Sequence, residues 1–469
     1  MTLIIVAFLL LGYFFIATEH ITRINKSATA MFLGVVGWIL YMYTGSTYVR
    51  SMYPAEYAHF LNGQSSTAET VKTFIAQNIF VDYTAYICGI VLFLLATMSI
   101  VEVLNVNGCF DFIRGWVRMR NSRRLLWSLV AITFLLSANL DNLTTTVMML
   151  VVMRQIVATT KFRMLYGSAI VLAANSGGCF TVIGDVCSLM LGSKGTITPT
   201  DFAGALVVPS LIATIIPTYL ISRKLPESID VESQHIYYRG DDTVLRPWQR
   251  VLMFFVGIGG LWFIPTFHNL TKLPPFVGAL CVLGLFWVIN EICNRKLIRS
   301  NQPVHRTIPR FLQYENLQNI LFFIGVCLAV GVLSETGALR VAAMWCDDKI
   351  HNTYVVGIAL GLISSVLDNV ALVFTSMSLY DVTEYASVLR RIDPEYANFF
   401  SINGQYWHLI SFCGSVGGCL LPIGSVSGYA LMKSEGVTIW WYFRHITLKV
   451  LAGWLLGLGA YYLIDLWVR

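Results

Sequence analysis

Two long apolar stretches of this chain each carry an aspartate close to the middle. The first stretch is 125–153 and holds Leu140-Asp141-Asn142, and the second is 352–379 and holds Leu367-Asp368-Asn369. An ionisable residue at the centre of a membrane-spanning segment costs about 2.5–3.5 kcal/mol to insert, so residues of this kind are usually functional. The fold must therefore hold two carboxyl groups inside apolar surroundings and away from lipid.

The composition indicates the class of protein. Of the 469 residues, 56% are hydrophobic and 12% are charged, and the mean hydropathy is +0.66. Ordinary soluble domains are about 25% charged, so we predict an all-α polytopic membrane protein whose main partner is the lipid bilayer. The net charge is +6, and the basic residues lie mainly between the apolar runs. At such positions they indicate membrane topology and not nucleic acid binding.

The sequence contains no motif of an enzyme or of a cofactor site. It has no phosphate-binding P-loop, no Gly-x-Ser-x-Gly and no His-Glu-x-x-His. The ten cysteines show no Cys-x-x-Cys or Cys/His spacing, so we expect them to act as small buried hydrophobic residues. We therefore expect neither catalysis nor a resident cofactor.

Ten apolar runs are long enough to cross a membrane, and the two aspartate-bearing stretches come in addition. Each aspartate-bearing stretch can form either one long tilted helix or a re-entrant hairpin with its polar tip at the midplane. A mixed segment at 46–81 and a charged linker at 223–248 are two of the longer connections. The ten predicted crossings are 2–18, 28–45, 84–104, 165–192, 203–222, 250–267, 275–292, 317–334, 403–432 and 446–467.

The distribution of positive charge favours the hairpins. With two hairpins, 23 of the 32 Lys and Arg fall on one face, which the positive-inside rule assigns to the cytoplasm. With two full crossings, the loops between residues 154 and 351 change sides and the asymmetry disappears. We therefore predict that hairpin 125–153 enters from the cytoplasm, that hairpin 352–379 enters from outside, and that both termini lie outside.

The two halves of the chain are predicted to be inverted repeats. Each half, 1–240 and 245–469, contributes five crossings and one hairpin, and an odd number of crossings inverts the second half. Residues 177–184 match 417–424 at five of eight positions with a constant offset of 240, whereas the two Leu-Asp-Asn phrases are offset by 227. Segment 380–402 contains the extra length that separates the hairpin from the broken helix in the second half.

Two glycine clusters predict that the helices at 165–192 and 403–432 are interrupted. Each glycine costs a helix about 1 kcal/mol relative to alanine, and unwound backbone is tolerated in a membrane where it lines a cavity or is buried in protein. Free carbonyl groups at such a break can bind a cation. Close helix packing through small residues is the alternative explanation. The glycines expected at the two breaks are Gly177, Gly178, Gly184, Gly417, Gly418 and Gly424.

The charges inside the predicted spans are acidic. Asp141, Asp185 and Asp368 lie away from the ends of their runs, and we find no Lys or Arg deep in any run. Carboxylate, amide and hydroxyl oxygens suit hard cations such as Na⁺ and Li⁺. A buried carboxylate can also hold a proton near neutral pH, so one group that binds either ion is a minimal exchanger.

We assign roles to the polar residues of these segments as hypotheses. Asp141 and Asp368 are the exchangeable ligands, and Na⁺ is expected at Asp141, Asn142, Asp368 and Asn369. Glu102 and His408 are possible accessory groups, although His408 fits a packing role better. The alternative role of the serine and threonine side chains is structural, because they can donate hydrogen bonds to the carbonyl groups of their own helix. The other residues expected to bind or line the site are Thr144, Thr145, Asn175, Ser176, Asp185, Ser188, Ser415, Ser425 and Ser427.

The motifs together resemble those of one known family. The stretch 137–146, Ser-Ala-Asn-Leu-Asp-Asn-Leu-Thr-Thr-Thr, is similar to the signature of NhaD-type Na⁺/H⁺ antiporters of the ion transporter superfamily. The resemblance implies inverted halves with hairpins and interrupted helices, a bacterial inner-membrane location, exchange of Na⁺ or Li⁺ for protons, and a homodimer. The other matching segments are 98–102, 174–178, 183–185, 367–370, 417–418 and 423–425.

Two other functions compete with cation/proton exchange. The first is a Na⁺-coupled carrier of a carboxylate or oxyanion with the same fold. Buried aspartates beside an anionic substrate would repel it, which argues against this reading. The second is a membrane scaffold without transport activity, which does not explain two matched sets of costly polar groups. We therefore predict an antiporter that works by alternating access.

Overall fold

The computed structural model describes residues 2–110, 119, 121–228, 245–298, 314–380 and 393–468. These residues form helices, and the isolated bridge between Asn121 and Ser228 is the β-type pairing found among them. Parts of the predicted linker 223–248, including the boundary at residue 240, and of the segment 380–402 lie outside the described residues. The predicted all-α architecture is confirmed for the part of the chain that the structure describes.

The first half of the chain supplies a long run of helices before the linker. Between α5 and α6, residues Ile75–Ile79 form one turn of π-helix. The helices are α1 (Thr2–Ala17), α2 (Glu19–Thr22), α3 (Lys26–Met52), α4 (Pro54–Leu61), α5 (Ala68–Phe74), α6 (Phe80–Val106), α8 (Ser122–Ser137), α9 (Asn142–Ile156), α10 (Thr160–Gly178), α11 (Val186–Ser193) and α12 (Pro199–Ser222).

The second half is helical in the same way. A second π-helical turn, Phe443–Thr447, precedes the last helix. The helices are α13 (Pro247–Thr271), α14 (Pro275–Ile298), α15 (Tyr314–Glu335), α16 (Ala338–Lys349), α17 (Thr353–Ser364), α18 (Asn369–Leu379), α20 (Pro394–Asn398), α21 (Gln405–Gly417), α22 (Val426–Glu435), α23 (Ile439–Tyr442) and α24 (Leu448–Val468).

Seven helices of the described residues are long and apolar enough to cross a membrane, so the chain is a polytopic membrane protein. They account for seven of the ten predicted crossings. Of the remaining three, run 2–18 forms α1, which has 16 residues, and runs 165–192 and 403–432 each contain two shorter helices. The seven spans are Lys26–Met52, Ala68–Val106, Pro199–Ser222, Pro247–Thr271, Pro275–Asn294, Leu317–Glu335 and Ile439–Trp467.

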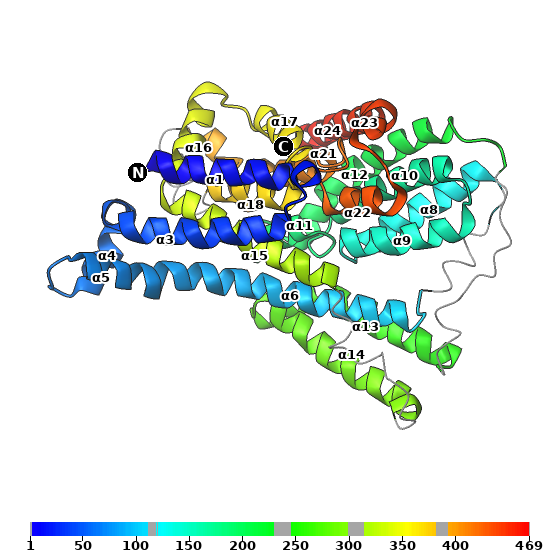
Figure 1. Cartoon of the computed structure of the whole chain (residues 1–469), viewed down its shortest axis with the longest axis horizontal. Coiled ribbons are helices and arrows are strands. Elements are labelled where there is room, and N and C mark those ends of the chain that lie inside the picture. The colour runs from blue at the N-terminus through cyan, green and yellow to red at the C-terminus, as the bar shows by residue number, and fades with distance from the viewer. Residues whose placement is uncertain are drawn as a thin grey trace.

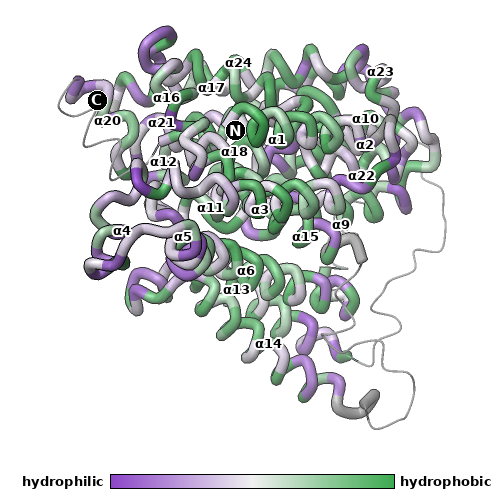
Figure 2. Tube along the Cα trace, turned by 60° about the vertical axis from the view of Figure 1, so that its left-hand side comes forward, coloured by the Kyte–Doolittle hydropathy of each residue, from purple (hydrophilic) through white to green (hydrophobic). Residues whose placement is uncertain are grey.

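The helices pack into a body from which α13 and α14 project along one edge (Figure 1). Both projecting helices are mainly hydrophobic along their middle, and outward side chains such as Phe255, Trp262 and Leu285 are at least half exposed (Figure 2). Inside the body, α3 lies along α15, and a Cβ on Gly325 would come within 2.4 Å of the backbone of Ala30. Small residues allow this close approach, as is usual between membrane helices.

Four pairs of helices are separated by short non-helical stretches at the polar motifs. α8 ends at Ser137 and α9 begins at Asn142, and α17 ends at Ser364 and α18 begins at Asn369. The helices of each of these two pairs are in contact, and α8 and α9 lie side by side in Figure 1. At the glycine clusters, α10 is followed by α11 after residues 179–185, and α21 is followed by α22 after residues 418–425.

Candidate ion-binding site

The carboxylate of Asp185 lies at the centre of the polar motifs. Asp185 comes directly before α11, and 3% of it is exposed. Its Oδ1 accepts a hydrogen bond of 3.2 Å from Asn142 Nδ2, and its Oδ2 accepts one of 2.7 Å from Ser415 Oγ. The two donors come from α9 and α21, so this one carboxylate joins the Leu-Asp-Asn motif of the first half to the broken helix of the second.

Asn175 extends this network to the last glycine cluster. Its Oδ1 accepts a hydrogen bond of 3.0 Å from Asn142 Nδ2, and its Nδ2 lies 3.4 Å from Ser425 Oγ. Ser425 in turn caps α22, because its Oγ accepts a bond of 3.1 Å from the backbone N–H of Gly428. Five of the predicted site residues, Asn142, Asn175, Asp185, Ser415 and Ser425, therefore form one connected hydrogen-bond network.

Asp141 lies beside this network and borders a small cavity. Its Oδ2 caps α9 by accepting hydrogen bonds from the backbone N–H of Thr144 at 3.1 Å and from Thr144 Oγ1 at 3.3 Å. A cavity of about 40 Å³ is lined by Asp141, Asn142, Asp185, Asn319 and Asn369, together with apolar side chains. A water molecule needs at least about 10–15 Å³, so this cavity has room for a small ion and a ligating water.

Asp368 is held differently from Asp141. It caps α18 by accepting a hydrogen bond of 3.1 Å from the backbone N–H of Val370, and its Oδ2 lies 3.0 Å from Lys26 Nζ. The side chain of Asp368 is 4% exposed and that of Lys26 is 13% exposed, so the ion pair is largely buried. The next residue, Asn369, is tied to the second glycine cluster, because its backbone N–H donates to Gly424 O at 3.1 Å.

Two further residues border the acidic groups and were not among the predicted site residues, Lys26 and Asn319. Lys26 falls between the predicted runs 2–18 and 28–45, so it is not deep in any run, but its side chain is 13% exposed in the folded protein. Lys26 is the first residue of α3, and Asn319 lies in the second turn of α15. Position near the start of an apolar run is the signal that both share, but such residues normally lie at the membrane surface.

Several predicted residues lie outside the side-chain hydrogen-bond network around Asp185, although their polar side chains are buried. Ser188 donates to the backbone carbonyl of Asp185 at 2.9 Å. Buried polar atoms usually have hydrogen-bond partners, so those that lack one within the described part of the chain mark positions where water or an ion can bind. Among the residues predicted to bind an ion or line its site, these atoms are Thr145 Oγ1, Ser176 Oγ, Asn369 Nδ2 and Ser427 Oγ.

The two accessory residues do not line the cavity at Asp141. Glu102 is buried on α6, one helical turn beyond Met98, which does line that cavity. His408 lies on α21 beside a different cavity of about 800 Å³, where its Nδ1 is 3.0 Å from Tyr461 Oη and its Nε2 is 3.4 Å from Asp201 Oδ2. His408 is therefore part of a separate polar cluster.

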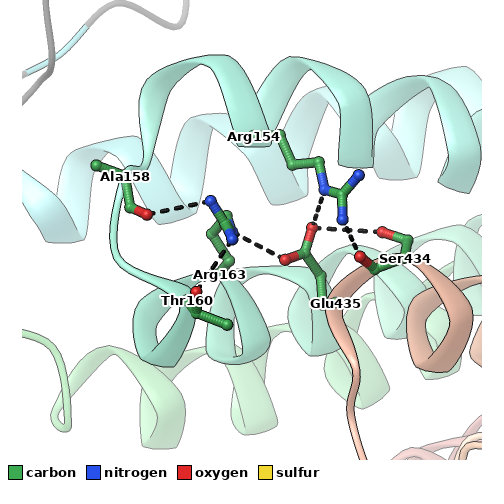
Figure 3. Close-up of polar contacts among 6 residues, drawn as sticks. All are labelled: Arg154, Ala158, Thr160, Arg163, Ser434 and Glu435. Atoms are coloured by element: carbon green, nitrogen blue, oxygen red, sulfur yellow. Dashed lines mark hydrogen bonds and ion pairs between the residues drawn. The ribbon is translucent and has the colours of Figure 1, made fainter.

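A second link between the halves lies at the far ends of α9 and α22 (Figure 3). The fully buried carboxylate of Glu435 pairs with Arg154 Nε at 2.5 Å and with Arg163 Nε at 2.9 Å. Arg154 also donates to the backbone carbonyl of Ser434, and Arg163 donates to Ala158 O and Thr160 Oγ1, each at 3.1 Å. This cluster fixes α22 of the second half against α9 and α10 of the first.

We expect Glu435→Gln to lower the melting temperature of the purified protein. The change leaves two arginines without their common carboxylate, and removing one partner of a buried hydrogen-bonded group costs about 1–3 kcal/mol. The measurement is thermal unfolding in detergent, followed by tryptophan fluorescence. Glu69→Gln, at an exposed position in the first turn of α5, is the control. Equal melting temperatures for the two variants would show that the cluster does not stabilise the protein.

The fold and the site together define a class of protein. Buried carboxylate, amide and hydroxyl groups converge where membrane helices are broken, and this arrangement is characteristic of secondary transporters. The chain matches the family model described as citrate transporter over residues 5–402. It is 32% identical over 452 residues to sodium/proton antiporter 1 of Arabidopsis thaliana, covering 96% of this chain and 70% of that protein.

Two further relatives agree with this match. Sodium/proton antiporter 2 of Arabidopsis thaliana is 30% identical over 456 residues, which cover 96% of this chain and 97% of the relative. The Na⁺/H⁺ antiporter NhaD of Vibrio cholerae is 27% identical over 394 residues, which cover 79% of this chain and 75% of the relative. The chain belongs to the NhaD-type family of ion transporters, and the family resemblance of its motifs is confirmed.

Proposed function

We propose that this protein is a secondary transporter that exchanges Na⁺, and also Li⁺, for protons across the membrane. The observation that carries the proposal is the carboxylate of Asp185, held by Asn142 and Ser415 from opposite halves of the chain next to the cavity at Asp141. Relatives of this chain bear the name sodium/proton antiporter, which supports the same exchange here. The aspartates that border this cavity, Asp141 and Asp185, are the shared ligands for the cation and the proton.

The chemistry of the cavity favours a small cation over an organic anion. Its polar lining consists of the carboxylates and amides of Asp141, Asn142, Asp185, Asn319 and Asn369. These oxygen ligands suit Na⁺ and Li⁺. Binding pockets for small organic molecules have volumes of about 300–1,000 Å³, whereas this cavity has about 40 Å³. A Na⁺-coupled carrier of carboxylates is therefore not favoured.

Pairs of equivalent contacts support two inverted repeats. Adding the offset of 240 converts Asn175 into Ser415 and Asp185 into Ser425. The bond from Ser415 to Asp185, at 2.7 Å, and the bond from Asn175 to Ser425, at 3.4 Å, are therefore the same contact seen from the two halves. Such reciprocal pairs are expected when two repeats meet across a pseudo-two-fold axis.

A second reciprocal pair supports the hairpins. Ser137 Oγ, at the end of α8, donates to Ala174 O of α10 at 2.6 Å, and Ser364 Oγ, at the end of α17, donates to Gly414 O of α21 at 2.7 Å. The offsets of 227 and 240 relate these contacts, as they relate the sequence motifs. We propose that α8–α9 and α17–α18 are re-entrant hairpins of halves 1–240 and 245–469, and that the halves move relative to each other to give alternating access.

The membrane location, orientation and assembly belong to the same proposal. We propose a bacterial inner-membrane protein with both termini outside, since most basic residues then face the cytoplasm. Reporter fusions at each terminus measure this orientation. The homodimer stays a prediction from the family resemblance, and light scattering of the purified protein measures it.

Proton flux in everted vesicles tests the exchange, and we expect Asp141→Asn to abolish it. The vesicle interior is acidified and a quenched pH-sensitive dye reports the gradient after NaCl, LiCl, KCl or disodium succinate is added. Dequenching by NaCl and LiCl is expected for the native protein. The variant loses it because a neutral amide can neither release a proton nor balance the charge of the cation.

The control for this assay separates loss of the site from loss of the protein. Asp348→Asn changes an exposed carboxylate at the end of α16, whose side chain is 71% exposed, and should leave dequenching unchanged. The amount of each variant in the membrane is measured in parallel. Dequenching by Asp141→Asn at the native rate would contradict the site. Uptake of succinate that requires Na⁺, without any cation-dependent dequenching, would favour the carboxylate carrier.

A further inference from the structure

Asp141 and Asp368 occupy equivalent positions in the two repeats. Each is the residue directly before a helix, α9 or α18, and each accepts a hydrogen bond of 3.1 Å from a backbone N–H of the first turn. Each is followed by an asparagine that is buried in the protein. Two equivalent carboxylates would offer two equivalent positions for a monovalent cation.

Lys26 breaks this symmetry. Its Nζ lies 3.0 Å from Asp368 Oδ2 and 4.3 Å from the centre of the Phe322 ring. In the ranges that the structure describes, no Lys or Arg nitrogen lies within 4.0 Å of Asp141. A positive charge from the protein itself therefore accompanies one of the two carboxylates, and the other borders the cavity of about 40 Å³.

The fold holds Lys26 at this depth by several contacts. α3 begins near the middle of the long axis of the molecule (Figure 1). Asn25 caps this helix end by accepting a bond of 2.8 Å from the backbone N–H of Ser27, and the N–H of Lys26 donates to Glu19 Oε1 at 3.3 Å. Ser27 Oγ donates to Gln318 O at 2.8 Å, which fastens the turn to α15. The lysine is thus anchored and does not reach Asp368 from a free loop.

We infer that the ammonium group of Lys26 is a built-in cation for the second carboxylate, so that the protein binds one transported Na⁺ per chain, at Asp141 and Asp185. This inference rests on the proposed function and adds the number of ions and the reason for it. An ammonium group and Na⁺ both carry one positive charge, and a buried carboxylate that already has a fixed cationic partner has no need of a second one. Lys26 consequently excludes Na⁺ from Asp368 while leaving the equivalent position at Asp141 available.

Equilibrium binding of ²²Na⁺ to the purified protein tests the inference. The native protein should saturate at one Na⁺ per chain. Lys26→Gln removes the internal cation and should raise the bound Na⁺ about twofold, because Asp368 then lacks its partner. The double variant Lys26→Gln/Asp368→Asn replaces the pair by neutral groups of similar size and should return to the native value. Non-additivity of this kind identifies an interaction between the two residues.

The controls keep the result independent of folding. Lys272→Gln, at an exposed position after α13, should behave as the native protein. Saturation of the native protein at two Na⁺ per chain would overturn the inference, and this measurement needs no variant. A second ion that is absent in Lys26→Gln, or that persists in the double variant, would overturn it as well. Failure of the native protein to bind Na⁺ at all would instead overturn the proposed function.

Discussion

Replacing Asp185 by asparagine is expected to abolish Na⁺-dependent proton exchange in a protein that still folds. The native carboxylate accepts bonds from Asn142 at 3.2 Å and from Ser415 at 2.7 Å, one on each oxygen. An asparagine keeps the shape but has one acceptor oxygen and no charge. Removing the charge that pairs with a buried cation costs at least about 2 kcal/mol. The cation should therefore bind at least about 30-fold more weakly to the variant.

Proteoliposomes that contain the purified variant provide the measurement, with Asp348→Asn as the exposed control. The native protein should also show competition between the two ions. The proposed function has a proton and Na⁺ bind the same carboxylates, so the KM for Na⁺ should rise by up to about tenfold for each pH unit of acidification where the proton outcompetes Na⁺. A KM that does not change with pH, or native exchange by Asp185→Asn, would exclude a shared carboxylate at this position.

Replacing Gly177 or Gly417 by alanine is expected to destabilise the protein severely. A Cβ on Gly177 would lie 2.4 Å from the backbone oxygen of Phe134, and one on Gly417 would lie 2.6 Å from that of Gly361. Both atoms belong to backbone, so no side-chain rotation can relieve the clash, and the helices must move apart. Overpacking of this kind costs about 1–3 kcal/mol, and more where the backbone cannot shift.

Helical glycines with open surroundings provide the matched controls. A Cβ on Gly204 in α12 or on Gly284 in α14 would meet no atom within 4 Å. Alanine favours a helix by about 1 kcal/mol relative to glycine, so these two variants should be unchanged or more stable. Melting temperatures of the four variants make the comparison. Equal melting temperatures for all four variants would show that α10 is not in tight backbone contact with α8, nor α21 with α17.

Most of the polar network was predictable because its members are unusual in their local sequence. Asn142, Asn175 and Asp185 lie inside apolar runs, where any polar group is costly and therefore conspicuous. The glycine clusters are conspicuous for the same reason, since they weaken a helix wherever they occur. The network that joins these residues across the two halves could not be predicted, because it depends on how α10 and α21 pack.

Residues near the ends of helices were harder to interpret. Glu335 directly follows the predicted crossing 317–334, a position that indicates the membrane boundary, yet it is 2% exposed and accepts hydrogen bonds from the hydroxyl groups of Tyr53 at 2.9 Å and Tyr83 at 3.0 Å. Lys26 opens a span and forms a buried ion pair with Asp368. A hydropathy profile shows how far a residue lies from the end of an apolar run. It does not show how deeply that residue is buried in the folded protein.

The sequence by itself determined the membrane class, most of the helices and the polar residues of the candidate site, because burial in an apolar environment makes each polar residue costly wherever the chain is folded. The tertiary structure alone decided which of these groups meet. It brought Ser415 of α21 to Asp185, left His408 in a separate cluster, and placed Lys26 against Asp368. Ser415 and Asp185 are more than two hundred positions apart in the sequence, as are Lys26 and Asp368. His408, in contrast, shares a predicted run with Ser415 but lies in a different cluster. Only the packing of whole helices can set such distances.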